Sequence, residues 1–236
     1  MSEQDFQRLK ALSKKRPEPY PCEKNRYYNI LPFDENTVQL STKEYINASH
    51  IQTSICPHRK YIATQAPIPE TFCDFYQMIW DYDIRTVLML TETKKGKSDC
   101  YWPQFEERVD MNGITVQLVS EDCFHGLIIR KLRLDHRTTT RSITHIQFVE
   151  WPDHSIPKVE PFLRLLEITK DETHFVVHCS AGVGRTGVFC AMDSLRHCQG
   201  KLFDIVREFR QQRMMMVETL EQYQFCETVL QLLNKP

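Results

Sequence analysis

Hydrophobic residues recur along the chain with two different periods. A period of three to four residues predicts amphipathic helices, and Phe6, Leu9 and Leu12 near the start are one example. Pro69 suits the first turn of another helix. The buried side of that helix is expected to carry Phe72, Phe75, Tyr76, Ile79 and Trp80. The expected helices cover residues 2–12, 69–82, 159–170, 186–198, 202–212 and 219–233. The last third of the chain is therefore predicted to be mostly helical.

Other segments show the alternation or the short apolar runs of β-strands. The run TVLMLT suits a central strand, and HFVV is a buried strand that leads directly into a loop with several glycines. The expected strands cover residues 86–91, 114–120, 124–134, 143–150 and 174–177. Strands and helices in this order predict an α/β fold of the α+β type, with a mixed sheet flanked by helices. We expect a single domain over residues 1–236, with residues 1–20 as an N-terminal helix and arm.

Composition and charge exclude several classes of protein. Apolar residues make up 41% and charged residues 26% of the 236 residues, as in globular domains with a core. The formal net charge of −1 gives no reason to expect nucleic acid as a partner. No apolar run reaches the roughly 18 residues of a membrane span, and the N-terminus has no signal-peptide core. The oligomeric state stays open, with a monomer as the expectation.

The nine cysteines are odd in number and contain no CxxC pair. This pattern is typical of reduced thiols in an intracellular protein, and we expect a cytoplasmic location. Zinc is not expected, because ligand pairs at short spacing are missing, and no other cofactor is expected. Cys190, Cys198 and Cys226 fall in predicted helices, where they are expected to pack rather than to bind a ligand.

One loop concentrates chemistry. The chain has only seven glycines, yet Gly182, Gly184 and Gly187 lie within six residues, after Cys179 and around Arg185. A loop between a buried strand and a helix can turn successive N–H groups inward and so bind an anion. Arg185 adds a planar fork for two phosphate oxygens. These groups, together with His178, should favour the thiolate of Cys179, which is a strong nucleophile.

A buried cysteine beside a helix is often only a small hydrophobic residue, and a glycine-rich loop alone is a weak signal. The combination of His, Cys, five residues, Arg and Thr is more specific. The segment VHCSAGVGRTG resembles the signature loop of the protein tyrosine phosphatases. Other segments of the chain resemble further motifs of that family and occur in the same order. They are KNRYYNILPFD, YINAS, YIATQAP, YWP, WPDHSIP and ETLEQYQF. The resemblance covers nearly the whole chain and implies that family's highly twisted sheet, with the signature loop between a central strand and a helix.

The resemblance implies a mechanism without metal or organic cofactor, acting on phosphotyrosine-containing proteins or peptides. Cys179 would attack phosphorus to form a cysteinyl-phosphate, and Thr186 would donate a hydrogen bond to its sulfur. Phosphate would be held by Arg185 and the loop amides of Ser180, Ala181, Gly182, Val183 and Gly184. Asp153 would be the general acid and then the base, on a loop anchored by Trp151. Asp153 could instead only cap the turn after Pro152.

Further residues match the family's motifs around this site. Tyr27 matches a tyrosine that forms an aromatic wall, although a plain core tyrosine is the alternative. Lys97 and Glu92 match a flanking loop, in which Glu92 would hold Arg185 through an ion pair. Gln222 matches a glutamine that helps to orient water.

The chain departs from the family pattern at five positions: Glu218 for glutamine, Asn29 for aspartate, Met215 for glycine, and Ala66 and Ser155 for glycines. Three other functions remain open. A binding protein without turnover is supported by Glu218 and Ser155. A phosphatase that also accepts phosphoserine or phosphothreonine is disfavoured by Tyr27. A sulfur-transfer enzyme would leave the WPD and KNRY motifs unexplained.

Overall fold

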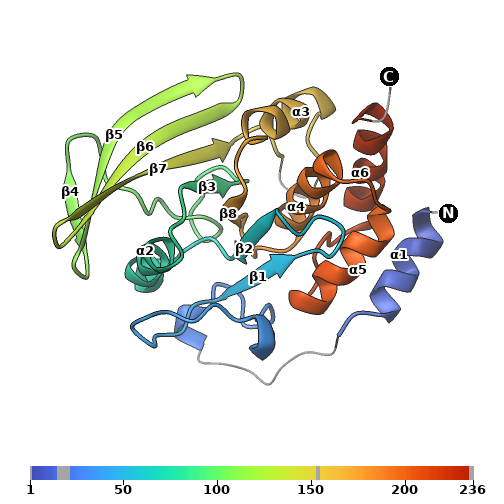
Figure 1. Ribbon diagram of the computed structural model, residues 1–236, viewed down its shortest axis with the longest axis horizontal. Helices are drawn as coiled ribbons and strands as arrows, with labels where there is room; N and C mark the ends of the chain where they lie inside the picture. Colours follow the sequence, from blue (N-terminus) through green and yellow to red (C-terminus); the bar gives the residue numbers. More distant parts are fainter. Residues whose placement is uncertain (1, 15–21, 153–154, 234–236) are drawn as a thin grey trace.

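The computed structural model describes residues 2–14, 22–152 and 155–233. Among these residues one mixed sheet runs in the order β1-β2-β8-β3-β7-β6-β5-β4 (Figure 1). The strands are β1 (Ala48–Gln52), β2 (Lys60–Thr64), β3 (Thr86–Met89), β4 (Arg108–Met111), β5 (Ile114–Phe124), β6 (Leu127–His136), β7 (Thr139–Phe148) and β8 (His174–His178). The helices are α1 (Ser2–Ala11), α2 (Phe72–Asp81), α3 (Val159–Ile168), α4 (Gly184–His197), α5 (Leu202–Gln212) and α6 (Leu220–Leu233). Short 3-10 helices cover Cys22–Lys24, Asp34–Asn36 and Pro69–Thr71.

Four neighbouring strands, β2, β8, β3 and β7, run parallel to one another. Their ends are in register: His178 of β8 pairs with Thr64 of β2 and with Met89 of β3, and Met89 pairs with Gln147 of β7. The segments after these strands therefore leave the sheet from one edge. Open sheets with parallel strands bind ligands at this carboxyl edge.

Alternating residues of the central strands feed two hydrophobic cores on opposite faces of the sheet. Phe175 and Val177 of β8 pack in the core that is covered by α1, α3, α4, α5 and α6. Val176, between them, packs in the second core, with α2. Figure 1 shows α4, α5, α6 and α1 grouped together, away from α2. Because β8 is buried on both faces, the loop that follows it starts from a fixed position.

Most of the expected elements are confirmed. The helix expected over residues 69–82 begins as a 3-10 turn and becomes α-helical at Phe72. Leu12, expected on the buried side of the first helix, is 45% exposed because α1 ends at Ala11. The sequence patterns missed β1, β2 and β4, which are only four or five residues long and include polar positions. No helix among the described residues is long and apolar enough to span a membrane.

Candidate active site

A cavity of about 560 Å³ opens at the carboxyl edge of the parallel strands. It brings together most of the residues expected to act. They are Tyr27, Asn29, Glu92, Lys97, Trp151, Cys179, Ser180, Ala181, Val183, Gly184, Arg185, Glu218 and Gln222. Cys179 is 5% exposed. The cavity is therefore a candidate active site with a thiol as its most buried reactive group.

The loop after Cys179 has its carbonyl groups bonded on the side away from the cavity. Cys179 O lies 3.1 Å from His178 Nδ1, and Ser180 O accepts from Ala66 N at 2.9 Å. Val183 O accepts from the backbone N–H of Gly187 at 2.9 Å. A trans peptide directs its N–H opposite to its C=O. The N–H groups that follow these carbonyls therefore turn toward the cavity, as in an anion-binding nest.

Arg213 completes this arrangement and was not predicted from the sequence. Its guanidinium donates to Gly182 O at 2.8 Å and to Ala181 O at 3.1 Å. It also donates to Asn47 Oδ1 at 2.9 Å and to Ser49 Oγ at 3.1 Å. Arg213 is fully buried, and no carboxylate of the described residues forms an ion pair with it. Its sequence context, between a helix and three methionines, gives no signal of this role.

Burial lowers the pKa of Arg213 to about 10, so the group stays charged at neutral pH. Its charge and that of a Cys179 thiolate attract each other. A buried cation bonded only to oxygens of neutral groups favours a negative charge above it. The floor of the cavity is therefore electropositive because of a residue that does not line the cavity itself.

The glycines of the loop are required by close packing. Gly182 has a φ of +72°, and a Cβ there would lie 2.0 Å from Thr64 O. A Cβ on Gly187 would lie 2.3 Å from Val217 N. The loop is thus held between the end of β2 and the segment before α6, and no side chain fits at either contact.

His178 differs from its expected role. Burial lowers its pKa to about 4, so the ring is neutral at physiological pH and adds no positive charge for Cys179. Because Cys179 O can only accept, Nδ1 carries the proton and Nε2 accepts from the Tyr101 hydroxyl at 2.7 Å. Tyr101 in turn accepts from His145 Nε2 at 2.7 Å, and His145 Nδ1 accepts from Arg130. His178 is therefore a neutral positioning group.

Thr186 also differs from expectation. It lies in the first turn of α4 and is fully buried. Its Oγ1 has no hydrogen-bond partner among the described residues, so the expected bond to Cys179 Sγ is not formed in this structure. A buried hydroxyl without a partner costs about 1–3 kcal/mol.

Arg185 projects from the beginning of α4 into the cavity. It donates to Leu90 O and to Pro152 O, each at 3.2 Å, from the segments that follow β3 and β7. Glu92 lines the same cavity but is exposed at its rim. The ion pair expected between Glu92 and Arg185 is not among those of the described residues.

Tyr27 is bonded to the loop that it was expected to face. Ser180 Oγ donates to Lys97 O at 2.7 Å, so the Tyr27 hydroxyl, at 2.7 Å, donates to Ser180 Oγ. Tyr27 is half-buried. Tyr27 and the flanking loop with Lys97 are thus both hydrogen-bonded to the Ser180 hydroxyl.

Asp153 lies outside the described residues. On either side of it, Trp151 is 2% exposed and donates from Nε1 to Ser155 O at 2.9 Å. Its ring packs edge-on against Phe148 and Phe162. These contacts hold the Trp151 side chain in place, and its role as the anchor of the loop stays a prediction.

Glu218 and Gln222 lie over the start of α4. A Cβ on Gly184 would lie 2.8 Å from Gln222 Nε2 and 2.9 Å from Glu218 Oε2. Gln222 Oε1 accepts from Glu218 N at 2.9 Å, which directs the Nε2 group of the amide toward Gly184. A carboxylate and an oriented amide therefore face the position where a bound phosphate would meet the loop.

Asn29 and Met215 line the rim of the cavity. Asn29 is half-buried. Met215 has a left-handed backbone with a φ of +56°, an uncommon conformation for a residue other than glycine. The rim thus contains local strain at a position where the family pattern has glycine.

Comparison with known proteins agrees with this geometry. The family model described as Protein-tyrosine phosphatase matches residues 21–231. The chain is 37% identical to human tyrosine-protein phosphatase non-receptor type 20, over 92% of this chain and 56% of the relative. It is 38% identical to mouse tyrosine-protein phosphatase non-receptor type 7, over 91% of this chain and 65% of the relative. It is also 36% identical to rat phosphatidylinositol phosphatase PTPRQ, over 92% of this chain and 10% of that relative.

The solved structure of PTPN18 in complex with HER2-pY1196 phosphopeptides is similar in fold, with a TM-score of 0.90. The two chains are 28% identical, with coverage of 99% of this chain and 93% of PTPN18. The chain thus spans from a tenth to about two thirds of the curated relatives, and almost all of the solved structure. With the matching family model over residues 21–231, these similarities show that the chain belongs to the protein-tyrosine phosphatase family.

Proposed function

We propose that this chain hydrolyses phosphotyrosine in proteins through a cysteinyl-phosphate on Cys179. The observation that carries the proposal is the loop above Arg213. Its carbonyls are bonded on the outside, its N–H groups turn toward the cavity, and a charged guanidinium lies beneath, with no carboxylate of the described residues paired to it. Such a cradle stabilises the equatorial oxygens of phosphorus during transfer.

The reaction takes two steps. The Cys179 thiolate attacks phosphorus, the P–O bond to tyrosine breaks, and Asp153 gives its proton to the leaving phenolate. Water then attacks the cysteinyl-phosphate, Asp153 takes a proton from it, and the P–S bond breaks to release phosphate and the thiolate. Arg185 and the loop amides bind phosphate in both steps. Glu218 and Gln222 lie where they would meet the attacking water.

Tyr27 supports tyrosine rather than serine or threonine as the phosphorylated residue. Its hydroxyl is fixed to Ser180, so its ring stands as a wall beside the cradle and can stack on the ring of a substrate. A thiol nucleophile requires a reducing compartment, which agrees with a cytoplasmic location. The eight cysteines whose side chains the structure describes are all free.

The test is steady-state hydrolysis of a phosphotyrosine peptide at pH 5–8, with the matched phosphothreonine peptide and an inositol phospholipid in parallel. The lipid is included because one relative is named as a phosphatidylinositol phosphatase. We expect turnover of the phosphotyrosine peptide, none by Cys179→Ser, and a strong reduction by Asp153→Ala. Tight peptide binding without turnover would instead make the chain a binding protein. Faster turnover of the lipid or the phosphothreonine peptide would overturn the proposed substrate.

A further inference from the structure

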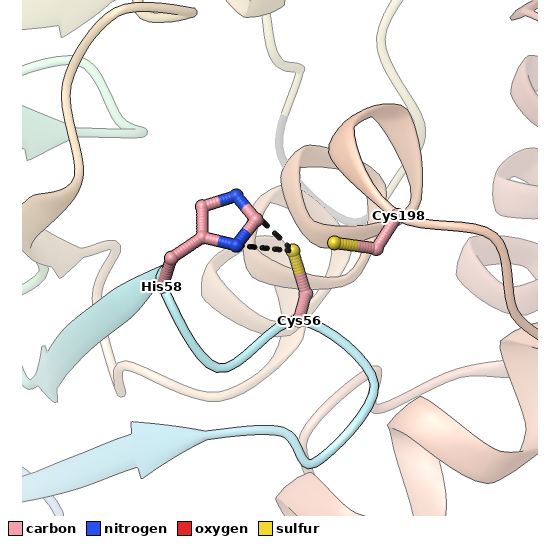
Figure 2. A group of neighbouring side chains, drawn as sticks. All are labelled: Cys56, His58 and Cys198. Atoms are coloured by element: carbon pink, nitrogen blue, oxygen red, sulfur yellow. Dashed lines mark hydrogen bonds between the residues drawn. The ribbon is translucent and has the colours of Figure 1, made fainter.

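A second group of reactive side chains lies away from the active site. Cys56 and His58 belong to the loop between β1 and β2, and Cys198 follows directly after α4. Figure 2 shows the two sulfur atoms facing each other, with the His58 ring beside Cys56. The ligand atoms of all three residues lie within 4.8 Å of one another. Cys56 Sγ is 3.7 Å from His58 Nε2 and 3.9 Å from Nδ1.

The distance from Cys56 Sγ to His58 Nε2 is that of two ligands around one tetrahedral ion. Zinc bonds of about 2.3 Å to sulfur and about 2.0 Å to nitrogen, at a tetrahedral angle, place sulfur and nitrogen about 3.6 Å apart. Cys56 is fully buried, whereas His58 is exposed. The His58 ring can therefore turn either nitrogen toward an ion without disturbing the core. Its exposure also leaves the fourth position open to water.

We propose that Cys56, His58 and Cys198 form a zinc site. Zn²⁺ would displace the two thiol protons into solvent, and the two resulting thiolates would balance its charge. The neighbouring charges do not compete for the ion, because Arg59 and Asp193 are buried and paired with each other at 2.5 Å. Thiolate and imidazole ligands favour zinc over the cations that prefer oxygen ligands.

The site would be structural rather than catalytic. Helix α4 has 14 residues, which correspond to roughly 21 Å, and Gly184 of the phosphate loop is at its opposite end. An ion at Cys198 would fasten the end of α4 to the loop that leads into β2. The spacing of cysteines and histidines in the sequence does not indicate this site, because Cys198 lies far from Cys56 and His58 along the chain. Cys198 was expected to pack in a helix.

The experiment uses the Cys179→Ser protein, so that the nucleophile itself cannot bind metal. Zinc is titrated against a chromophoric chelator, and metal retained after dialysis is measured by mass spectrometry. We expect one Zn²⁺ per chain. Co²⁺ in its place should give thiolate-to-metal charge-transfer absorption. Adding His58→Ala or Cys198→Ser should weaken binding at least about tenfold. Cys123→Ser, an exposed cysteine outside the cluster, is the matched control and should bind like the parent.

His58→Ala changes an exposed side chain, so its effect is not a failure to fold. Zinc should raise the Tm of the Cys179→Ser protein and raise that of the His58→Ala double variant less at the same zinc concentration. The assignment is overturned if no zinc is retained, or if Cys198→Ser and His58→Ala bind as tightly as the parent. A Cys56–Cys198 disulfide in the isolated protein, with no metal affinity after reduction, would also overturn it.

Discussion

The Tyr101 hydroxyl lies 2.7 Å from Nε2 of His178, the residue that precedes the nucleophile Cys179. This contact helps to determine which ring nitrogen of His178 carries the proton. Because Cys179 O must accept from His178 Nδ1, Tyr101 has to donate to Nε2. Both groups are buried, and burial raises the pKa of Tyr101 well above its usual value. A neutral tyrosine and a neutral histidine thus fix the first peptide of the phosphate loop without adding charge to the site.

Tyr101→Phe should destabilise the protein and weaken catalysis together. It leaves His178 Nε2 and His145 Nε2 buried without a partner, at about 1–3 kcal/mol. We expect a lower free energy of unfolding in urea and a lower kcat/KM. Tyr82→Phe removes an exposed hydroxyl bonded to Gln39 and is the control. Unchanged stability in Tyr101→Phe would show that the hydroxyl is not needed.

Lowering the pH from 7 to 5 should cost stability through His178. Its folded pKa, about 4, is below the value of 6.5 for an unperturbed ring. The unfolded chain therefore binds a proton first, and stability present above pH 6.5 is lost as the pH falls toward 4. At pH 5 the loss is about 2 kcal/mol. Urea unfolding at both pH values measures it, with NMR titration of the His178 ring; titration of that ring near pH 6.5 would refute the prediction.

Arg213→Lys should reduce phosphate binding more than it reduces stability. Lysine keeps the charge but cannot donate to Ala181 O and Gly182 O with a planar fork. The loop amides then lose their orientation, and we expect kcat/KM to fall on the order of tenfold to a hundredfold, consistent with about 1.5–3 kcal/mol for a charged hydrogen bond. Inhibition by inorganic phosphate should weaken in parallel. Arg207→Lys, on the surface beside Asp204, should change neither.

Glu218→Gln should speed the second chemical step. The carboxylate lies over the beginning of α4 and adds negative charge where water meets the cysteinyl-phosphate. We expect a burst of product before the steady state in the parent enzyme, and a smaller burst with a higher kcat in Glu218→Gln. Stopped-flow kinetics measure the burst in both proteins. Glu221→Gln, at another residue that lines the cavity, is the control. Equal bursts in both proteins would count against the assignment.

Met215→Gly should remove the backbone strain at the rim of the cavity and widen its mouth. The backbone there has a φ of +56°, which glycine adopts without strain, and the side chain is 37% exposed at the cavity mouth. We expect a lower KM for a bulky phosphopeptide, with little change for a small aryl phosphate. Met215→Ala, which keeps the strain but shortens the side chain, separates the effect of space from that of the backbone. No change in KM for either substrate would exclude Met215 as a gate.

The strands and helices that were predictable from sequence are those whose pattern is local. The apolar run of β3 and the periodic helices of the last third are examples. The candidate site could be predicted from the sequence because its characteristic residues lie in a few contiguous segments. Arg213 and Tyr101 were not predicted, since their roles arise from contacts with residues far away along the chain. The neutral state of His178 depends on burial, which the sequence around it does not specify.

The bond from Arg213 to the phosphate loop has a consequence for how the protein is made. Chains fold from the N-terminus as they leave the ribosome. Cys179 emerges before Arg213, and until α5 docks, the carbonyls of Ala181 and Gly182 lack the donor that turns them outward. We therefore expect a nascent chain to carry its nucleophile in an unshaped loop. Enzymatic competence would arrive only after α5 and Arg213 have been synthesised and docked.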